Sequence, residues 1–315
     1  MKAAVINQFG EAEKLQITDI NKPEINDDQV LIKVMAAGIN PVDTKVRAGT
    51  SGISRQIKLP AILGWDVGGT IESAGKNVAE LKPGNAVFGC IGFPGLGKAY
   101  AEFTVAYPKL LATKPANISF EEAAAVPLAG LTAYQAINEH LKITSGQKIL
   151  IQAAAGGVGH LAVQFSKLNG AYVYGTASEK NEKFLKSIGA DHVIDYKKEK
   201  FEDVVHHLDA VLDAMGGEIL YRSITCVKRG GTVVCLPSST KDDPKAIGLA
   251  REHGVKLIWP MMRPDGNEMR IIARLLEQKK LKVFVDKIFT LDQIVWAHKA
   301  VETHDTKGKV VIKIF

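Results

Sequence analysis

Hydrophobic and polar positions follow one pattern in the first hundred residues and another in the middle of the chain. Residues 1–6 and 29–39 read as strands rich in β-branched residues, and glycine and proline turns are dense as far as Gly97. Short strands between such turns are typical of a compact barrel or sandwich. Segments 68–75 and 82–90 fit it as two strands joined through a Pro-Gly turn.

From Gln147 onward, buried strands alternate with helices. The predicted strands cover 148–154, 171–178, 192–196, 208–215, 229–237 and 255–260, with helices at 159–170 and 179–189. This alternation predicts a parallel, doubly wound α/β sheet. Ahead of it, Ser119 and Glu122 have the spacing of a capping box for a helix that runs to Pro127, and a second helix is expected at 132–139.

The last stretch predicts helices at 268–280 and 291–303 and strands at 282–290 and 308–315. The simplest topology returns this tail to the N-terminal β-rich part. We therefore expect one domain built from residues 1–120 and 265–315, interrupted by a sheet domain of residues 121–264.

Composition narrows the class of protein. With 46% hydrophobic and 23% charged residues in 315, the chain has enough apolar surface to fold. No apolar run approaches the roughly 20 residues of a membrane span, and the N-terminus turns polar too early for a signal peptide. We expect a cytoplasmic protein without a membrane partner. Three cysteines are too few for a disulfide framework or a four-cysteine zinc site.

The net charge of +6 arises from 40 basic and 34 acidic residues without a long basic block. Nucleic-acid binders concentrate their charge in a patch or stripe, so no nucleic-acid partner is expected. Glycine, at 29 residues, is more frequent than the average of about 7%.

The candidate chemistry begins at a glycine cluster between a predicted strand and a helix. Gly156, Gly157, Val158 and Gly159 follow the strand, and Ala154 stands where the G-x-G-x-x-G pattern has its first glycine. Such a loop lets a pyrophosphate approach the backbone and the N–H groups of the helix N-terminus. The pattern predicts a dinucleotide site.

The end of the next strand bears on the choice of cofactor. Ser178 and Lys180 suit the 2′-phosphate of NADPH better than the acidic residue that usually binds the ribose of NAD. Glu179 argues against this unless it begins the helix, where the helix dipole favours an acid. Lys180 and Lys183 are equally consistent with solvated helix residues. We predict NADPH as the cofactor.

Four segments together resemble the medium-chain dehydrogenase/reductases, in the zinc-independent branch of quinone oxidoreductases and alkenal/enone reductases. They are residues 37–43, 63–69, 125–134 and 152–159. The resemblance covers nearly the whole chain. It implies a GroES-like β-barrel catalytic domain and a Rossmann domain, with the cofactor in the cleft between them.

The resemblance also implies chemistry without a metal. Zinc-dependent relatives have a catalytic Cys where this chain has Asn40 and a His where it has Trp65, and neither replacement is a good zinc ligand. Asn40 is expected near the nicotinamide and the substrate. Lys45 is a candidate cation or proton donor, although many quinone reductases have Tyr near that place. The alternatives are that Lys45 is a loop residue or pairs with Asp43 or Asp66; we expect Asp66 to fix the loop.

Further cofactor contacts follow from the same resemblance. Leu128 and Thr132 are expected beside the nicotinamide, Tyr196 at the adenosine phosphate, and Lys309 in a segment that folds back near the cofactor. The alternative for Tyr196 is a tyrosine at the edge of the sheet without a ligand. The alternative for Lys309 is an ordinary lysine at the end of a strand. Leu236 follows a predicted strand at the sheet edge where ligands bind. His160, at the start of the helix, is expected to be structural or exposed.

These residues predict an NADPH-dependent, zinc-free oxidoreductase that transfers hydride to a quinone or an α,β-unsaturated carbonyl. Reduction of the C=C bond of enals and enones is one alternative within that chemistry. A non-catalytic NADPH-binding sensor is the alternative outside it. The strand at 255–260 is suited to pair with its copy at a sheet edge, so a homodimer is expected.

Overall fold

A computed structural model describes all residues 1–315 and divides the chain into two compact units. Unit 1 comprises Met1–Leu131 and Arg263–Phe315, and unit 2 comprises Thr132–Met262. The first division falls inside α3 (Pro127–Gln135), whereas the sequence placed it after residue 120. The difference arises because α2 (Phe120–Ala124) packs against strands of unit 1.

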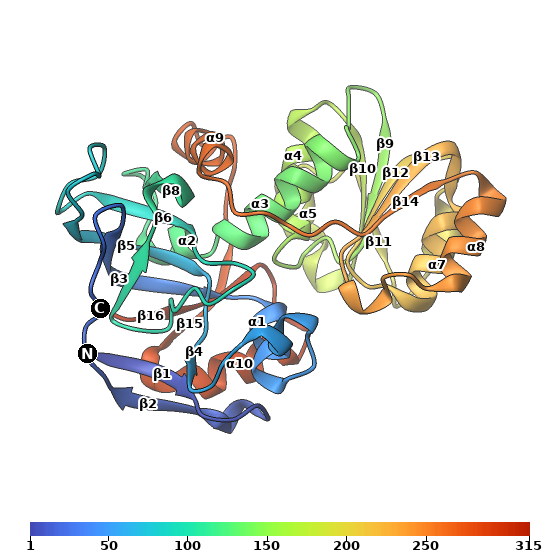
Figure 1. The fold of residues 1–315 in the computed structure, drawn as a ribbon. Coiled ribbons are helices and arrows are strands. Elements are labelled where there is room, and N and C mark those ends of the chain that lie inside the picture. Colours follow the sequence, from blue (N-terminus) through green and yellow to red (C-terminus); the bar gives the residue numbers. More distant parts are fainter. The chain divides into compact units, whose positions relative to one another are not determined.

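Unit 1 is built on a seven-stranded sheet whose long central strand is β3 (Figure 1). Its path runs β15 (Val285–Thr290), β16 (Lys309–Lys313), β3 (Val30–Ile39), β5 (Asp66–Ala74), β6 (Ala86–Cys90) and β8 (Leu111–Thr113), with β7 (Phe103–Ala106) also paired to β3. A separate three-stranded sheet has the order β2 (Leu15–Asp19), β1 (Lys2–Ile6) and β4 (Ala61–Ile62). The return of β16 to β3 confirms that the tail rejoins the N-terminal part.

Unit 2 contains a six-stranded sheet in which every strand pair is parallel. Its order is β11 (His192–Asp195), β10 (Tyr172–Ala177), β9 (Lys148–Ile151), β12 (Leu208–Asp213), β13 (Val227–Cys235) and β14 (Lys256–Ile258). The first strand of unit 2, β9, lies in the middle, and strand order reverses on either side of it. This is the doubly wound order of the Rossmann fold, so the predicted fold class is confirmed.

Helices cover these sheets and join their strands. Unit 1 carries α1 (Pro41–Ala48), α2, α9 (Gly266–Glu277) and α10 (Ile294–Glu302). Unit 2 carries α4 (Gly159–Leu168), α5 (Glu182–Ser187), α6 (Phe201–Val204), α7 (Gly217–Thr225) and α8 (Pro244–His253). None of the helices is long and apolar enough to cross a membrane.

The helices around Pro127 differ from the sequence prediction. Ser119 and Glu122 form the predicted capping box, with the two reciprocal hydrogen bonds at 3.1 and 2.8 Å. The next helix begins at Pro127 rather than near Thr132. The sequence pattern predicts that Pro127 ends a helix, but the fixed φ and missing N–H of proline suit the first position of a helix. Helix α1 was also missed, because its Asn-Pro start lies among turn residues.

A buried histidine in unit 1 gives folding a pH dependence. His298 on α10 is fully buried, and its ring meets that of Tyr100 edge-on at 5.6 Å. Burial, together with the positive charge of Arg47, lowers the pKa of His298 to about 3. An unfolded histidine ionises near pH 6.5, so below that pH the unfolded state binds a proton that the folded state does not.

We expect the free energy of unfolding to fall as the pH drops below about 6.5, with His298 contributing up to about 1.4 kcal/mol per pH unit. The His298→Leu variant should lose less stability than the wild type between pH 7 and pH 5 in urea titrations. His206→Leu, at an exposed position, is the control. Equal losses in the His298→Leu variant and the wild type would contradict this assignment.

Candidate active site

Three neighbouring strands of unit 1 bring Asn40, Asp66 and Lys309 together. In the sheet register, Val310 of β16 lies opposite Ile39 of β3, and Gly38 of β3 lies opposite Asp66 of β5. Lys309 begins β16, Asp66 begins β5, and Asn40 follows the last residue of β3. Strand pairing alone therefore places an ammonium, a carboxylate and a carboxamide at one end of the sheet.

Gly38 allows this convergence at the end of β3. A Cβ built on Gly38 would lie 2.3 Å from the carbonyl oxygen of Ala124 and 3.0 Å from the Oδ2 atom of Asp66. No larger residue fits there without moving α2 or the carboxylate. Gly38 lies within the segment 37–43 on which the sequence resemblance rests.

The three polar side chains form a closed hydrogen-bond network. Lys309 Nζ donates to the carbonyl oxygen of Ile39 at 2.9 Å, to Asn40 Oδ1, and to Asp66 Oδ2 at 3.4 Å. Asn40 Nδ2 donates to the same Asp66 Oδ2 at 2.9 Å. Each of the three residues exposes 3% of its surface or less.

Asp66 also holds the start of α3. Its Oδ1 accepts the backbone N–H of Leu128 at 2.7 Å, which is one of the helix N–H groups without an intrahelical partner. Thr132, the other residue predicted beside the nicotinamide, lies one turn further along α3. Asp66 thus holds the segment that leads into α3, which is the supporting role that the sequence suggests for it.

Asn40 occupies the N-cap position of α1, where it forms a capping box with Asp43. In it the backbone N–H of Asn40 donates to Asp43 Oδ2 at 2.7 Å. Burial raises the pKa of Asp43 to about 7, with the Asn40 N–H opposing that rise. Burial also raises the pKa of Asp66, while the Lys309 charge lowers it.

Lys45 lies apart from this network. It is on α1 with an exposed side chain, so it is not a loop residue. Asp66 pairs with Lys309 rather than with Lys45, and the sequence reasoning missed this pair. Only the register of β16 against β3 reveals it, because 243 residues separate the two partners.

Asn40 and Trp65, the two positions where the sequence resemblance expects zinc-dependent relatives to have zinc ligands, are both engaged in hydrogen bonds within the protein. Trp65 is fully buried, and its indole N–H donates to the carbonyl oxygen of Gly95 at 2.6 Å. Burial raises the pKa of the Cys90 thiol well above its usual range. No group of three or more His, Cys, Asp and Glu side chains could hold a metal ion.

In unit 2 the glycine loop leaves β9 and enters α4 through a strained residue. Ala153 has a left-handed backbone, with φ at +50°. Its N–H donates to Thr176 Oγ1 at 3.0 Å, and the N–H of Ala154 donates to the carbonyl oxygen of Thr176 at 3.0 Å. Two hydrogen bonds to Thr176 of β10 thus hold the loop in a conformation that alanine adopts at a cost of about 1–2 kcal/mol.

The loop glycines fit a bound pyrophosphate. A Cβ on Gly159 would lie 2.3 Å from the Ala153 carbonyl oxygen, so only glycine allows helix and strand to pack this closely. A Cβ on Gly156 would meet only that same oxygen, at 3.2 Å, which leaves the backbone of Gly156 clear of other atoms. Gly157 and Val158 complete the turn into α4, and no side chain caps its N-terminus. These are the roles that the dinucleotide fingerprint assigns to its second and third glycines.

A buried polar chain supports the loop from below, and the sequence reasoning did not find it. Thr176 Oγ1 donates to Gln152 Oε1 at 2.7 Å, Gln152 Nε2 donates to Ser223 Oγ at 3.2 Å, and Ser223 Oγ donates to Asp213 Oδ2 at 3.1 Å. Asp213 Oδ1 then accepts the N–H groups of Met215 and Gly216 at 2.8 and 2.7 Å. The chain links the ends of β9, β10 and β12.

The remaining predicted cofactor residues follow the carboxyl ends of neighbouring strands. Ala177 of β10 pairs with Asp195 of β11, so Ser178 and Tyr196 leave the sheet side by side. Ser178 is buried, whereas Tyr196 is 59% exposed. Lys180 is exposed in the next turn, and Leu236 follows β13 at the same edge. The structure gathers these residues at the carboxyl edge of the sheet.

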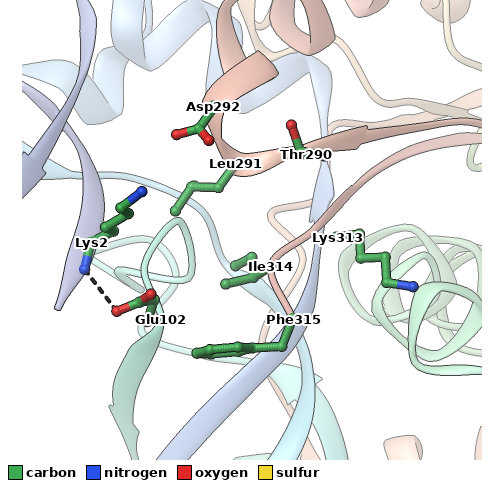
Figure 2. A pocket seen from close by; sticks show the side chains of 8 residues that line it. All are labelled: Lys2, Glu102, Thr290, Leu291, Asp292, Lys313, Ile314 and Phe315. Atoms are coloured by element: carbon green, nitrogen blue, oxygen red, sulfur yellow. Dashed lines mark hydrogen bonds between the residues drawn. The ribbon is translucent and has the colours of Figure 1, made fainter.

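His160 has a structural position beside the glycine loop, and the surface pocket lies elsewhere, in unit 1. His160 is buried, and its Nδ1 lies 2.9 Å from the Gly156 carbonyl oxygen, which fits a structural role. Figure 2 shows the pocket in unit 1, where the N–H of Lys2 donates to Glu102 at 2.8 Å beside the C-terminal residues Ile314 and Phe315. None of the predicted site residues lines this pocket.

Comparison with known proteins gives matches over the whole chain. Residues 26–116 match the family model "Alcohol dehydrogenase GroES-like domain", and residues 188–312 match "Zinc-binding dehydrogenase". A 2-methylene-furan-3-one reductase of Solanum lycopersicum is 37% identical over 99% of this chain and 79% of its own length. An NADPH-dependent alkenal/one oxidoreductase from the chloroplast of Arabidopsis thaliana is 35% identical over the same shares.

A solved structure of the quinone oxidoreductase from Coxiella burnetii superposes with a TM-score of 0.94 at 36% identity, covering 100% of this chain and 99% of that one. The similarity therefore extends over both units and is not confined to the glycine loop.

The strain at Ala153 can be measured. We expect Ala153→Gly to raise the free energy of unfolding by up to about 1 kcal/mol, because glycine adopts positive φ without penalty. Ala154→Gly is the matched control; it removes a buried methyl group at an unstrained position and should lower stability by about 1 kcal/mol. Urea titrations measure both, and a loss of stability in Ala153→Gly would show that the residue is not strained.

Proposed function

Because the chain belongs to the medium-chain dehydrogenase/reductase superfamily, in its quinone oxidoreductase branch, we propose that it is an NADPH-dependent reductase of quinones or α,β-unsaturated carbonyl compounds. The observation that carries the proposal is the edge of the unit 2 sheet. The glycine loop, Ser178, Tyr196 and Leu236 all lie at the carboxyl ends of its strands. Ligands of open parallel sheets bind at that edge, where strand order reverses.

Charge supports NADPH over NADH. Glu179 would repel a 2′-phosphate, but its carboxylate pairs with Lys198 Nζ at 2.8 Å. Ser178, Lys180 and Tyr196 would then offer hydroxyl and cationic groups to the phosphate. The Arabidopsis relative carries NADPH dependence in its name, which is consistent with this assignment.

The reaction needs one hydride and one proton. A bound nicotinamide cofactor supplies the hydride. The protein must then place the acceptor, stabilise the developing oxyanion and deliver the proton. The exposed ammonium of Lys45 is our candidate donor, and the N–H groups at the start of α4 are our candidates for binding the pyrophosphate.

We propose that this chemistry proceeds without zinc. Asn40 and Trp65 are committed to Lys309, Asp66 and Gly95, and neither is a zinc ligand. The family description that contains "zinc-binding" covers residues 188–312, which include neither of them. Metal analysis of the purified protein tests the point; stoichiometric zinc would overturn it.

Reduction of a C=C bond is the second candidate within this chemistry. The two relatives compared above by sequence are named for 2-methylene-furan-3-one and alkenal/one substrates, whereas the compared structure is named a quinone oxidoreductase. Both acceptors take hydride from the same cofactor. A non-catalytic NADPH sensor would bind the cofactor and turn over neither.

We also propose that the protein is a homodimer and that it is cytoplasmic. Strand β14 lies at the edge of the unit 2 sheet with partly exposed residues, which suits pairing with a second copy into a homodimer. Light scattering of the purified protein would measure the mass. A cytoplasmic location is the second proposal, and imaging of a tagged chain would test it.

Two assays test the choice of cofactor and the choice of substrate separately. We expect NADPH to bind more tightly than NADH when each is titrated by nicotinamide fluorescence; tighter NADH binding would contradict the choice of NADPH. We expect NADPH consumption with quinones or enones, with the product identified by mass. Binding without turnover on any acceptor would favour the sensor.

Replacing Lys45 tests its role as proton donor. We expect Lys45→Met to lower kcat by about 100-fold, the lower range for loss of a general acid, with little change in the Kd for NADPH. Lys82→Met, which removes another exposed lysine in unit 1, should leave kcat unchanged. A normal kcat in Lys45→Met would show that Lys45 is an ordinary solvated residue and not the proton donor.

A further inference from the structure

The ammonium of Lys309 is buried and fully engaged by the protein. An ammonium has three N–H donors, and Lys309 Nζ has three acceptors, the Ile39 carbonyl oxygen, Asn40 Oδ1 and Asp66 Oδ2. Only 3% of the residue is exposed. No N–H of the ammonium remains for a direct contact with the cofactor, near which the sequence resemblance places this lysine.

We propose instead that Lys309 is a positioning residue, whose ion pair with Asp66 fixes the orientation of the Asn40 carboxamide at the reaction site. This inference rests on the proposed function for its link to catalysis. It deepens that function by assigning an internal cation and its carboxylate to the orientation of Asn40, the residue expected near the nicotinamide and the substrate.

The physical basis is the polarity of the amide. Asn40 Oδ1 accepts from Lys309, and Nδ2 donates to Asp66. Rotating the amide by half a turn would place its NH₂ group against the ammonium and its oxygen against the carboxylate. Both contacts would then be repulsive in a buried setting, where charge interactions are strong. The ion pair thus selects one of the two amide orientations.

A fixed amide offers a fixed pattern to a bound molecule. One hydrogen of Nδ2 remains after the internal hydrogen bonds, since Oδ1 accepts from Lys309 and takes part in the capping box with Asp43. Its direction is set before any ligand arrives, which removes the cost of reorienting it during reaction. Without the ion pair, the amide could present its donor and acceptor either way round.

Hydrogen bonds that do not involve Lys309 also hold the network. Asp66 Oδ1 is held by the Leu128 N–H at 2.7 Å, and the Asn40 backbone N–H is held by Asp43 at 2.7 Å. Loss of Lys309 alone leaves two buried carboxylates, Asp43 and Asp66, without their shared cation. The single variant Lys309→Met is therefore a poor test, because an unpaired buried charge can unfold the protein.

The double variant Asp66→Asn/Lys309→Met removes both charges and keeps the shape of the site. We expect it to fold and to bind NADPH with a Kd within about twofold of the wild type by fluorescence titration. We expect its kcat to fall at least tenfold with a smaller change in KM. Lys313→Met, four residues further along β16 and exposed, should leave both constants unchanged.

A spectroscopic measurement on the protein without substrate separates this inference from the proposed function. The side-chain NH₂ of Asn40, identified by its absence in Asn40→Ala, should give two sharp, exchange-protected NMR signals in the wild type. In the double variant these signals should broaden or lose protection. If the wild type shows no turnover but the signals behave in this way, the proposed function fails and the positioning role stands.

Other outcomes overturn the inference. A Kd for NADPH raised tenfold or more at normal kcat would make Lys309 a cofactor ligand. An unchanged kcat, or Asn40 signals that do not change in the double variant, would show that the ion pair does not orient the amide. Failure of the double variant to fold would mean that the pair is needed for the fold itself, which would also overturn a role limited to positioning.

Discussion

A buried ammonium must find acceptors, and in unit 1 that requirement organises the end of the sheet. Lys309 meets them where β16, β3 and β5 lie in register. Burying a charge is costly unless it is paired and hydrogen-bonded, so Asp66 and the Asn40 carboxamide are as necessary to Lys309 as it is to them. Asp66 also accepts the backbone N–H of Leu128 in the first turn of α3, so the network holds the start of a helix as well as the end of the sheet. One ion pair thereby determines the orientation of an amide, a loop and a helix start.

Unit 2 reaches a similar result with a chain of hydrogen bonds. The chain from Thr176 through Gln152 and Ser223 ends on Asp213, and every link is a hydrogen bond of 3.2 Å or less. Its upper end holds Ala153 in a left-handed conformation that alanine would not adopt alone. Strain of this kind persists only where surrounding contacts over-determine it, and it is common at binding sites. The shape of the glycine loop is thus set by hydrogen bonds from β10 as well as by its glycines.

The sequence predicted those features that depend on local pattern. Alternation of buried strands and helices identified the doubly wound sheet, and Ser119 with Glu122 identified a helix start. The glycine spacing around Gly156 and Gly159 indicated the phosphate loop because the required contacts are made within a few residues. The place of Asn40 came from family resemblance.

What the sequence did not predict depends on contacts between distant residues. Lys309 was assigned to the cofactor because nothing local shows that its ammonium is covered, and only sheet register brings it to Asp66. Gln152 and Ser223 are unremarkable in sequence, since 71 residues separate the two ends of their hydrogen bond. Helix α1 is missing from the prediction because an Asn-Pro pair is as typical of a turn as of a helix start. The predicted start of α3 is late because Pro127 is consistent with a helix end as well as with the first position of a helix.

The position of β16 in the chain also bears on the order in which the protein can assemble during synthesis. Unit 2 is a continuous segment, Thr132–Met262, so all of its strands have been made before the second part of unit 1 begins. Unit 1 places β16 between β15 and β3. One of the strands that pair with β3 is therefore synthesised some 270 residues after it. Domains generally fold as units while the chain emerges. The network at Asn40 is then among the last parts of the protein to form, after the glycine loop has the residues it needs.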